Sequence, residues 1–213
     1  MKNRKIAAIF LVAAAFLAAF LAYPIMPEKT ITHWNAKGEA DGHMEKGVGS
    51  FFMPILAFCL LALFFILPKI DPLKKNYPAF ENEYWNFVVL LIAFFDYVYF
   101  LTLAINMGHG INMVQCLSPA FGVLFFYSGV LIEKAKQNWF IGVRTPWTLA
   151  NKRVWNKTHA ITGKLFKAAG AIALLGMLMP EVGMTASIAT ILVASVFSFA
   201  YSYFEYEKEK SIR

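Results

Sequence analysis

The segment that organises this sequence reads Asn138-Trp-Phe-Ile-Gly-Val-Arg-Thr-Pro-Trp147, and it lies in the longest stretch between two hydrophobic runs. Three of the five tryptophans and seven of the twenty lysines and arginines fall between residues 134 and 164. Thr145 followed by Pro146 predicts the start of a helix, because a threonine oxygen caps the first amides and proline's fixed φ suits the first helical position. We therefore expect a polar connector between two hydrophobic runs, with a helix that begins inside it.

The residues after Pro146 have the periodicity of an amphipathic helix. Apolar residues recur at steps of three, four or seven and so share one helical face: Trp147, Ala150, Val154, Ile161 and Leu165. Polar residues fall largely on the other side: Lys152, Asn156, His159 and Lys164. A basic amphipathic helix beside a membrane span usually lies in the headgroup layer, with its tryptophans at the apolar boundary. We therefore expect an inner interfacial helix, with Trp147 and Trp155 at the interface.

Composition indicates an integral membrane protein. Of the 213 residues, 59% are hydrophobic and only 15% are charged. A soluble domain of this size could not cover so much apolar surface with so few charges. The net charge of +7 is explained by basic loops beside a membrane. Because no stretch forms a basic face on a soluble domain, we expect no direct nucleic-acid partner.

Six apolar runs are long enough to cross a bilayer. They cover roughly residues 6–22, 51–67, 86–106, 114–132, 165–179 and 184–204. We therefore expect an all-α integral membrane protein, a six-transmembrane-helix bundle with one outer loop of about 27 residues. The predicted domains are an N-terminal helical hairpin at residues 1–75 and a four-helix membrane domain at residues 76–213, with an inner loop at 133–164.

The distribution of basic residues predicts the orientation of the chain. Seventeen of the twenty lysines and arginines lie in the two terminal segments and in alternate connections between the runs. The remaining connections hold only Lys29, Lys37 and Lys46. Because basic loops stay on the cytoplasmic side, we expect a multi-pass protein of the cell membrane with both termini in the cytoplasm and the first loop outside.

The polar stretch after the first run carries a second motif, His33-Trp34-Asn35 followed by Gly38 and Asp41-Gly42-His43. Together with the segment at 138–147 and the later strings V-W-N-K-T-H and G-K-L-F, it resembles the SdpI family of bacterial membrane proteins. In that family a domain of unknown function commonly precedes the SdpI motif. The matching motif residues here are Trp139, Gly142, Arg144, Thr145, Pro146, Trp147, Trp155, Lys157, His159 and Gly163. The acids that often follow T-P-W-T-L in the family are replaced here by residues 150–153, which makes this loop more basic.

The resemblance implies a membrane immunity or resistance protein that protects a cell against a secreted toxic peptide. It also implies a cytoplasmic transcriptional repressor as a partner of the inner loop, with membrane lipid around the bundle. It implies no enzymatic activity and no cofactor. The outer loop is expected to contact the toxin through five residues: His33, Trp34, Asn35, Gly38 and Asp41.

Asp96 motivates an alternative function, a small transporter or proton-coupled channel. It lies at the centre of the third run, where a carboxylate costs about 2.5–3.5 kcal/mol on insertion scales and is a functional candidate. A structural aspartate is equally compatible with the sequence, and Lys167 is the nearest basic residue by depth. His33 and His43, with Asp41, are weak metal candidates, because turn chemistry explains this loop better. A membrane enzyme has the least support, since His159 falls on the opposite side of the membrane.

Overall fold

The computed structural model describes residues 2–35, 37–175 and 180–211. Seven α-helices are described: α1 (Lys2–Ala22), α2 (Lys46–Ile70), α3 (Glu81–Asn106), α4 (Met113–Lys134), α5 (Pro146–Ala150), α6 (Lys152–Leu175) and α7 (Pro180–Ser211). Two short 3₁₀ helices, η1 (Tyr23–Ile25) and η2 (Lys74–Ala79), and two strands, β1 (Lys29–Trp34) and β2 (Ala40–Glu45), complete the described elements.

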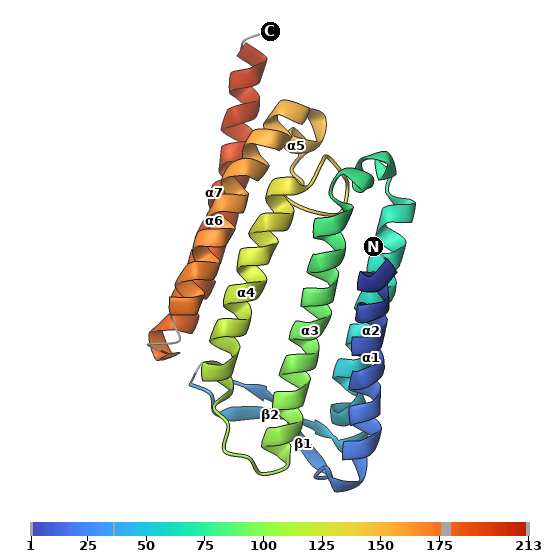
Figure 1. Ribbon diagram of the computed structural model, residues 1–213. Helices are drawn as coiled ribbons and strands as arrows, with labels where there is room; N and C mark the ends of the chain where they lie inside the picture. The colour runs from blue at the N-terminus through green and yellow to red at the C-terminus, as the bar shows by residue number, and fades with distance from the viewer. Residues whose placement is uncertain (1, 36, 176–179, 212–213) are drawn as a thin grey trace.

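The long helices run side by side as a bundle with two distinct ends (Figure 1). The short helix α5 and the C-terminus lie at one end, and the β1–β2 hairpin lies at the other. Helix α3 packs on α1 and α2, while α4 packs on α6 and α6 packs on α7. Contacts between α3 and α4 join these two halves.

Five described helices are long and apolar enough to span a membrane: α1, α2, α3, α4 and α7. They correspond to the first four and the last of the predicted spans. The predicted fifth span at 165–179 begins in the second half of α6, and its residues 176–179 lie outside the described part of the chain. The six-helix count and the domain boundary at residue 75 therefore stay predictions.

The prediction of an all-α chain was wrong for the outer loop, which contains an antiparallel hairpin of β1 and β2. The segment Thr30-Ile31-Thr32 is rich in the β-branched residues that favour strands. The hairpin is attached to the bundle, because Asn106 at the end of α3 bonds both the backbone N–H of Ile31, at 2.8 Å, and its carbonyl, at 3.0 Å. Side chains on the hairpin are thus held in fixed positions relative to the helices.

The prediction of one continuous amphipathic helix from Pro146 to Leu165 was also wrong, whereas its place at the membrane interface stays a prediction. Helix α5 ends at Ala150, Asn151 has an extended backbone with φ −139°, and α6 then begins at Lys152. The Asn151 Oδ1 accepts the N–H of Arg153 at 2.8 Å, which caps the new helix. Helix α6 continues from there into the predicted fifth span and packs against α4 along its length.

Four glycines allow α4 and α6 to approach until their backbones touch. A Cβ on Gly129 of α4 would lie 2.5 Å from the carbonyl oxygen of Gly163 on α6, and a Cβ on Gly163 would lie 2.7 Å from the Gly129 carbonyl. Seven residues away on each helix, Gly170 of α6 and Gly122 of α4 meet in the same way. A Cβ on Gly170 would be only 2.6 Å from the Gly122 carbonyl oxygen. Small residues at such positions are typical of helix packing in membranes. We call these four residues the glycine seam.

Candidate functional site

The connection between α4 and α5 is a compact loop organised by a buried asparagine. Asn138 is completely buried, and its Oδ1 accepts the backbone N–H groups of Phe140 at 2.9 Å and Ile141 at 2.6 Å. Its Nδ2 donates to the carbonyls of Lys136 and Ile141 at 2.8 and 3.0 Å. One side chain therefore satisfies both backbone donors and backbone acceptors of the turn, which fixes the path of the segment. We call residues 135–151, which comprise this connection, α5 and Asn151, the motif loop.

Asp71, at the end of α2, ties the motif loop to the first half of the bundle. Its carboxylate is 1% exposed and accepts three hydrogen bonds, from Leu73 N–H at 2.6 Å, Tyr77 O–H at 3.2 Å and Trp139 N–H at 2.9 Å. Asn76 adds a second tie, because its Nδ2 donates to the carbonyl of Gln137 at 2.6 Å. Asp71 could not be predicted from the sequence, because its partner Trp139 lies 68 residues away and leaves no local pattern.

Gly142 and His159 form the closest contact inside the motif. Gly142 has φ +100°, and a Cβ there would collide with the Nε2 of His159. The same Nε2 accepts the backbone N–H of Val143 at 3.1 Å, and the Nδ1 lies 2.8 Å from the Trp155 carbonyl. Trp155 stacks on the imidazole with ring centroids 3.8 Å apart. The prediction that His159 and Trp155 lie on the polar face and at the interface was therefore wrong: both are at most 1% exposed.

The hydrogen bonds of His159 define its protonation state. Because Nε2 accepts from a backbone N–H, it carries no proton, and Nδ1 is the donor to the Trp155 carbonyl. Burial lowers the pKa of His159 to about 4. The imidazole is therefore neutral near pH 7 and acts as a structural link between α6 and the motif loop, instead of as a proton carrier.

Thr145 and Pro146 begin helix α5 as predicted. Thr145 Oγ1 accepts the N–H of Thr148 at 3.2 Å, and Thr148 Oγ1 accepts the N–H of Thr145 at 3.0 Å, which is a reciprocal capping box. The Thr145 hydroxyl also lies 3.0 Å from the hydroxyl of Ser202 on α7. Trp147 packs edge-on against Phe199 of the same helix, with centroids 5.3 Å apart. The cap thus fixes α5 against α7.

Lys157 links α6 to the end of α7 through charges. Its ammonium donates to Glu205 and, at 2.9 Å, to Glu209. Arg153 reaches Glu209 at 3.5 Å from one turn earlier on α6. The two glutamates are each under 10% exposed, so they are largely shielded from solvent by their basic partners. Lys157 of the predicted motif therefore pairs with Glu205 and Glu209. Gly163, another residue of that motif, belongs to the glycine seam.

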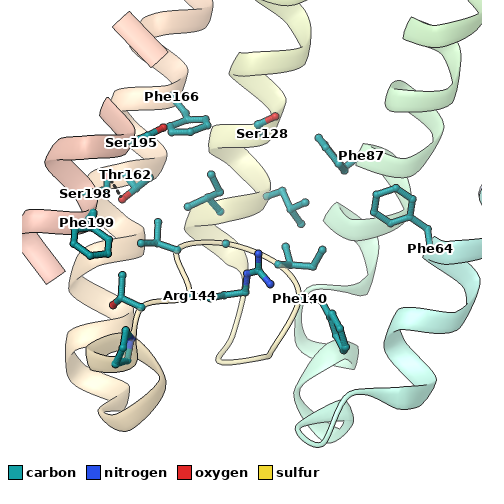
Figure 2. Close-up of a pocket in the computed structure, with 17 residues that line it drawn as sticks. Phe64, Phe87, Ser128, Phe140, Arg144, Thr162, Phe166, Ser195, Ser198 and Phe199 are labelled. Carbon is teal, nitrogen blue, oxygen red and sulfur yellow. Dashed lines mark hydrogen bonds between the residues drawn. The ribbon is translucent and has the colours of Figure 1, made fainter. Parts of the chain in front are cut away.

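A cavity of about 550 Å³ opens beside the motif loop, between the two halves of the bundle. Figure 2 shows Arg144 in the middle of this space, with Phe64 and Phe87 on one side and Phe166 and Phe199 on the other. The guanidinium Nη1 donates to the carbonyl of Trp139 at 3.0 Å. Arg144 is the charged residue among those that line the cavity.

The motif at residues 33–43 forms the hairpin at the other end of the bundle. His33 on β1 and Asp41 on β2 pair across the hairpin, with Nδ1 2.6 Å from Oδ1, and their side chains are 71% and 45% exposed. Gly42 lies opposite His33, and a Cβ there would be 2.7 Å from the histidine Cβ. Gly38 has φ +82° in the turn between the strands, as its residue type suggested.

Asn35 organises that turn. Its Oδ1 accepts the N–H groups of Lys37 at 2.9 Å and Glu39 at 3.1 Å, while its Nδ2 donates to the Glu39 carboxylate at 2.9 Å. Trp34 is half-buried beside it and pairs with Ala40 in the hairpin register. The predicted contact residues therefore lie together on one hairpin, about a turn that their own side chains stabilise.

Comparison with known proteins matches both of these regions of the chain. Residues 134–202 match the SdpI/YfhL protein family, and residues 10–58 match a domain of unknown function, DUF1648. The part of the chain from 134 to 202 is thus similar to the SdpI/YfhL family. The immunity protein SdpI of Bacillus subtilis (strain 168) is 28% identical to the chain over 207 residues, which is 97% of each sequence. No solved structure matches the chain.

The predicted resemblance to the SdpI family is thus confirmed, with both parts in the predicted order. The SdpI/YfhL match contains every residue of the inner motif and also Ser202, which bonds the Thr145 cap. The DUF1648 match contains the hairpin. Together with the apolar helices, the similarity identifies a membrane protein related to immunity proteins and supports a non-enzymatic role.

Asp96 lies outside the SdpI/YfhL match, in the middle of α3. It is 3% exposed, and neither carboxylate oxygen has a hydrogen-bond partner among the residues that the structure describes. Lys167 does not reach it, because that ammonium bonds Glu133 at 2.6 Å. Among the same residues, no group of three or more His, Cys, Asp or Glu side chains could hold a metal ion. His33 and His43 thus lie outside any such group.

Proposed function

We propose that this protein protects the membrane of the cell that makes it against a secreted toxic peptide. The observation that carries the proposal is the end-to-end similarity to an immunity protein, 28% identity over 97% of both chains. A match of this extent includes the hairpin, the motif loop and the helices that connect them. The proposal therefore concerns the whole molecule and not an isolated motif.

The hairpin is the proposed contact surface for the peptide. Its exposed side chains include His33 and Asp41, and its backbone is held to α3 by Asn106. Thr30 is 1% exposed and packs closely on Gly49 of α2, because a Cβ added to Gly49 would be only 2.7 Å from the Thr30 Cβ. A surface that is already fixed loses little conformational freedom when it binds, which favours affinity.

Electrostatic attraction contributes modestly to this contact. The acids of the hairpin are offset by nearby basic groups, since Lys46 lies 3.7 Å from Glu28 and His33 lies 2.6 Å from Asp41. Exposed charge pairs are weak and screened by salt. Recognition therefore relies on the aromatic side chain of Trp34 and on the shape of the turn, with a weak dependence on ionic strength.

A signalling role belongs to the motif loop in this proposal. If a transcriptional repressor binds there, the exposed basic side chains of Lys136 in the loop and Lys152 at the start of α6 are the available contacts. Arg144 is also exposed, but it lines the cavity (Figure 2). Protection and repressor binding are therefore assigned to opposite ends of the bundle.

Protection is tested by expressing the gene in a sensitive host and measuring survival against peptides encoded near the gene. We expect Trp34→Ala to reduce survival strongly and His43→Ala, an exposed substitution on the neighbouring strand, to leave it unchanged. Equal survival with both variants would move the contact away from the hairpin. Killing that the wild-type protein does not reduce would contradict the immunity function.

The same assay separates protection from transport. Asp96→Asn removes the ionisable group while keeping the side-chain shape. Transport through a proton-coupled path would be lost in this variant, whereas peptide neutralisation at the hairpin would be retained. Loss of survival in Asp96→Asn, with normal membrane insertion, would favour the transporter.

A further inference from the structure

We propose that the cavity beside the motif loop binds one anionic phospholipid, with its headgroup phosphate on Arg144 and an acyl chain among the phenylalanines. The proposal goes beyond protection against a peptide and does not rest on it. It concerns a second ligand at the opposite end of the molecule from the hairpin (Figure 1).

The cavity has the size and lining of a lipid-chain site. Its volume of about 550 Å³ lies within the range of small-molecule pockets, roughly 300–1,000 Å³. Helices of both halves of the bundle contribute its walls, and five phenylalanines line it: Phe64, Phe87, Phe140, Phe166 and Phe199. Such walls bind hydrocarbon and repel a free hydrated ion.

Arg144, which is exposed to solvent, supplies a cationic group at the edge of this apolar space. A guanidinium carries five N–H donors, and one hydrogen bond of this side chain is described, to the carbonyl of Trp139 at 3.0 Å. Among the described residues, no carboxylate lies within 4.0 Å of it. The group is therefore available to a ligand that brings its own negative charge.

The nearby acids already have other partners. Asp71 accepts hydrogen bonds from three donors, and Glu133 pairs with Lys167. The lining hydroxyls are also engaged: Ser128 donates to the Leu124 carbonyl at 2.7 Å and Ser195 to the Ile191 carbonyl at 2.8 Å, each within its own helix. Arg144 thus determines which charge the cavity accepts.

A phosphate at the level of the headgroups fits this arrangement best. Arginine binds phosphate through paired N–H donors, whereas an isolated charge in hydrocarbon is costly. Trp139 lies next to Arg144 in the loop and is 49% exposed, and exposed tryptophans are enriched at the membrane–water boundary. A peptide that arrives at the hairpin end would have to cross the length of the bundle to reach this cavity.

Native mass spectrometry of the delipidated, detergent-purified protein tests the proposal. We expect one tightly retained phosphatidylglycerol and much weaker retention of phosphatidylcholine, whose headgroup is neutral overall. Arg144→Ala should weaken phosphatidylglycerol binding about tenfold or more, the scale of a lost charge-assisted hydrogen bond. Arg144→Lys should lose less. Lys152→Ala, at an exposed basic residue that begins α6 and does not line the cavity, should bind like the wild type.

A second pair of variants tests the cavity without changing charge. Ser195→Phe fills the space from α7, where the serine hydroxyl bonds only within its own helix, and should also abolish tight binding. Val193→Phe on the exposed side of the same helix is the control and should bind normally. This pair remains decisive if Arg144→Ala does not fold.

Three results would overturn the assignment. The first is equal retention of the two lipids by the wild-type protein. The second is displacement of phosphatidylglycerol by millimolar inorganic phosphate, which would indicate a phosphate site without a lipid chain. The third is unchanged lipid binding in Arg144→Ala and Ser195→Phe together with lost protection, which would identify the peptide as the occupant.

Discussion

The Oδ2 of Asp71 accepts the backbone N–H of Trp139 at 2.9 Å, across a separation of 68 residues in sequence. The carbonyl of the same tryptophan accepts from Arg144. The backbone at residue 139 is therefore held from both sides, by an acid in the first half of the chain and by a base of the motif loop. This pairing positions Arg144 at the cavity.

We predict that Asp71→Ala detaches the motif loop from the first half of the bundle. The substitution leaves three donors without their acceptor, and a buried donor without a partner costs about 1–3 kcal/mol. The thermal unfolding midpoint of the purified protein should fall clearly, and proteolysis within residues 135–151 should become faster. Glu207→Ala, an exposed acid on α7, should change neither measurement.

Gly142→Ala should be severely destabilising. A methyl group there would collide with His159, and φ +100° strains any residue with a Cβ. We expect a loss of about 2 kcal/mol or more in unfolding free energy. Gly110→Ala is the matched control, because nothing lies within 4 Å of its Cβ position. The cost of Gly142→Ala should shrink in a His159→Ala background; equal costs in both backgrounds would rule out the contact as its cause.

Stability should decrease in acid because of His159. Its folded pKa of about 4 lies below the ordinary value of 6.5, so the folded state prefers the neutral ring. This contribution is fully present above pH 6.5 and is lost as the pH falls from there through 4, by about 3 kcal/mol in total. His159→Gln should flatten that part of the pH–stability curve. An unchanged curve would contradict the buried neutral imidazole.

The orientation of the chain is tested by cysteine labelling from outside the cell. In a background with Cys59 and Cys116 replaced by alanine, a cysteine at Lys37 should react with a membrane-impermeant reagent. A cysteine at Lys152 should react only after the membrane is opened. The reverse pattern would invert the assignment of the hairpin and the motif loop to the two sides.

The membrane helices could be predicted from the sequence because burial in lipid needs only long apolar runs, and five of the predicted spans coincide with described helices. The Thr145–Pro146 helix start was equally local. The hairpin was not predicted although residues 30–32 are three consecutive β-branched residues, because the glycines and asparagine that follow are equally typical of an irregular loop. A strand needs a partner, and the paired residues are between 6 (Trp34 with Ala40) and 16 (Lys29 with Glu45) residues apart in sequence.

The position of His159 was predicted on the wrong face for a geometric reason. Periodicity was counted from Trp147 through Leu165 as one helix, but the extended backbone at Asn151 separates α5 from α6 and resets the helical phase. Counted from Lys152, Trp155 and His159 are four residues apart and share the buried face. Asp71 could not be found in this way, since only the folded chain brings Trp139 to it.

The glycine seam has a mechanical consequence for the whole molecule. At the hairpin end of the bundle, Gly38 lies against Asn112 at the start of α4, with a Cβ position 3.3 Å from its Oδ1. Because Gly129 and Gly163 place backbone against backbone, α4 and α6 cannot rotate or slide past each other without a steric clash. We therefore expect a displacement of the hairpin turn to shift α4 and α6 together. His159 on α6 would move with them, and so would the motif loop, whose Val143 N–H bonds the imidazole.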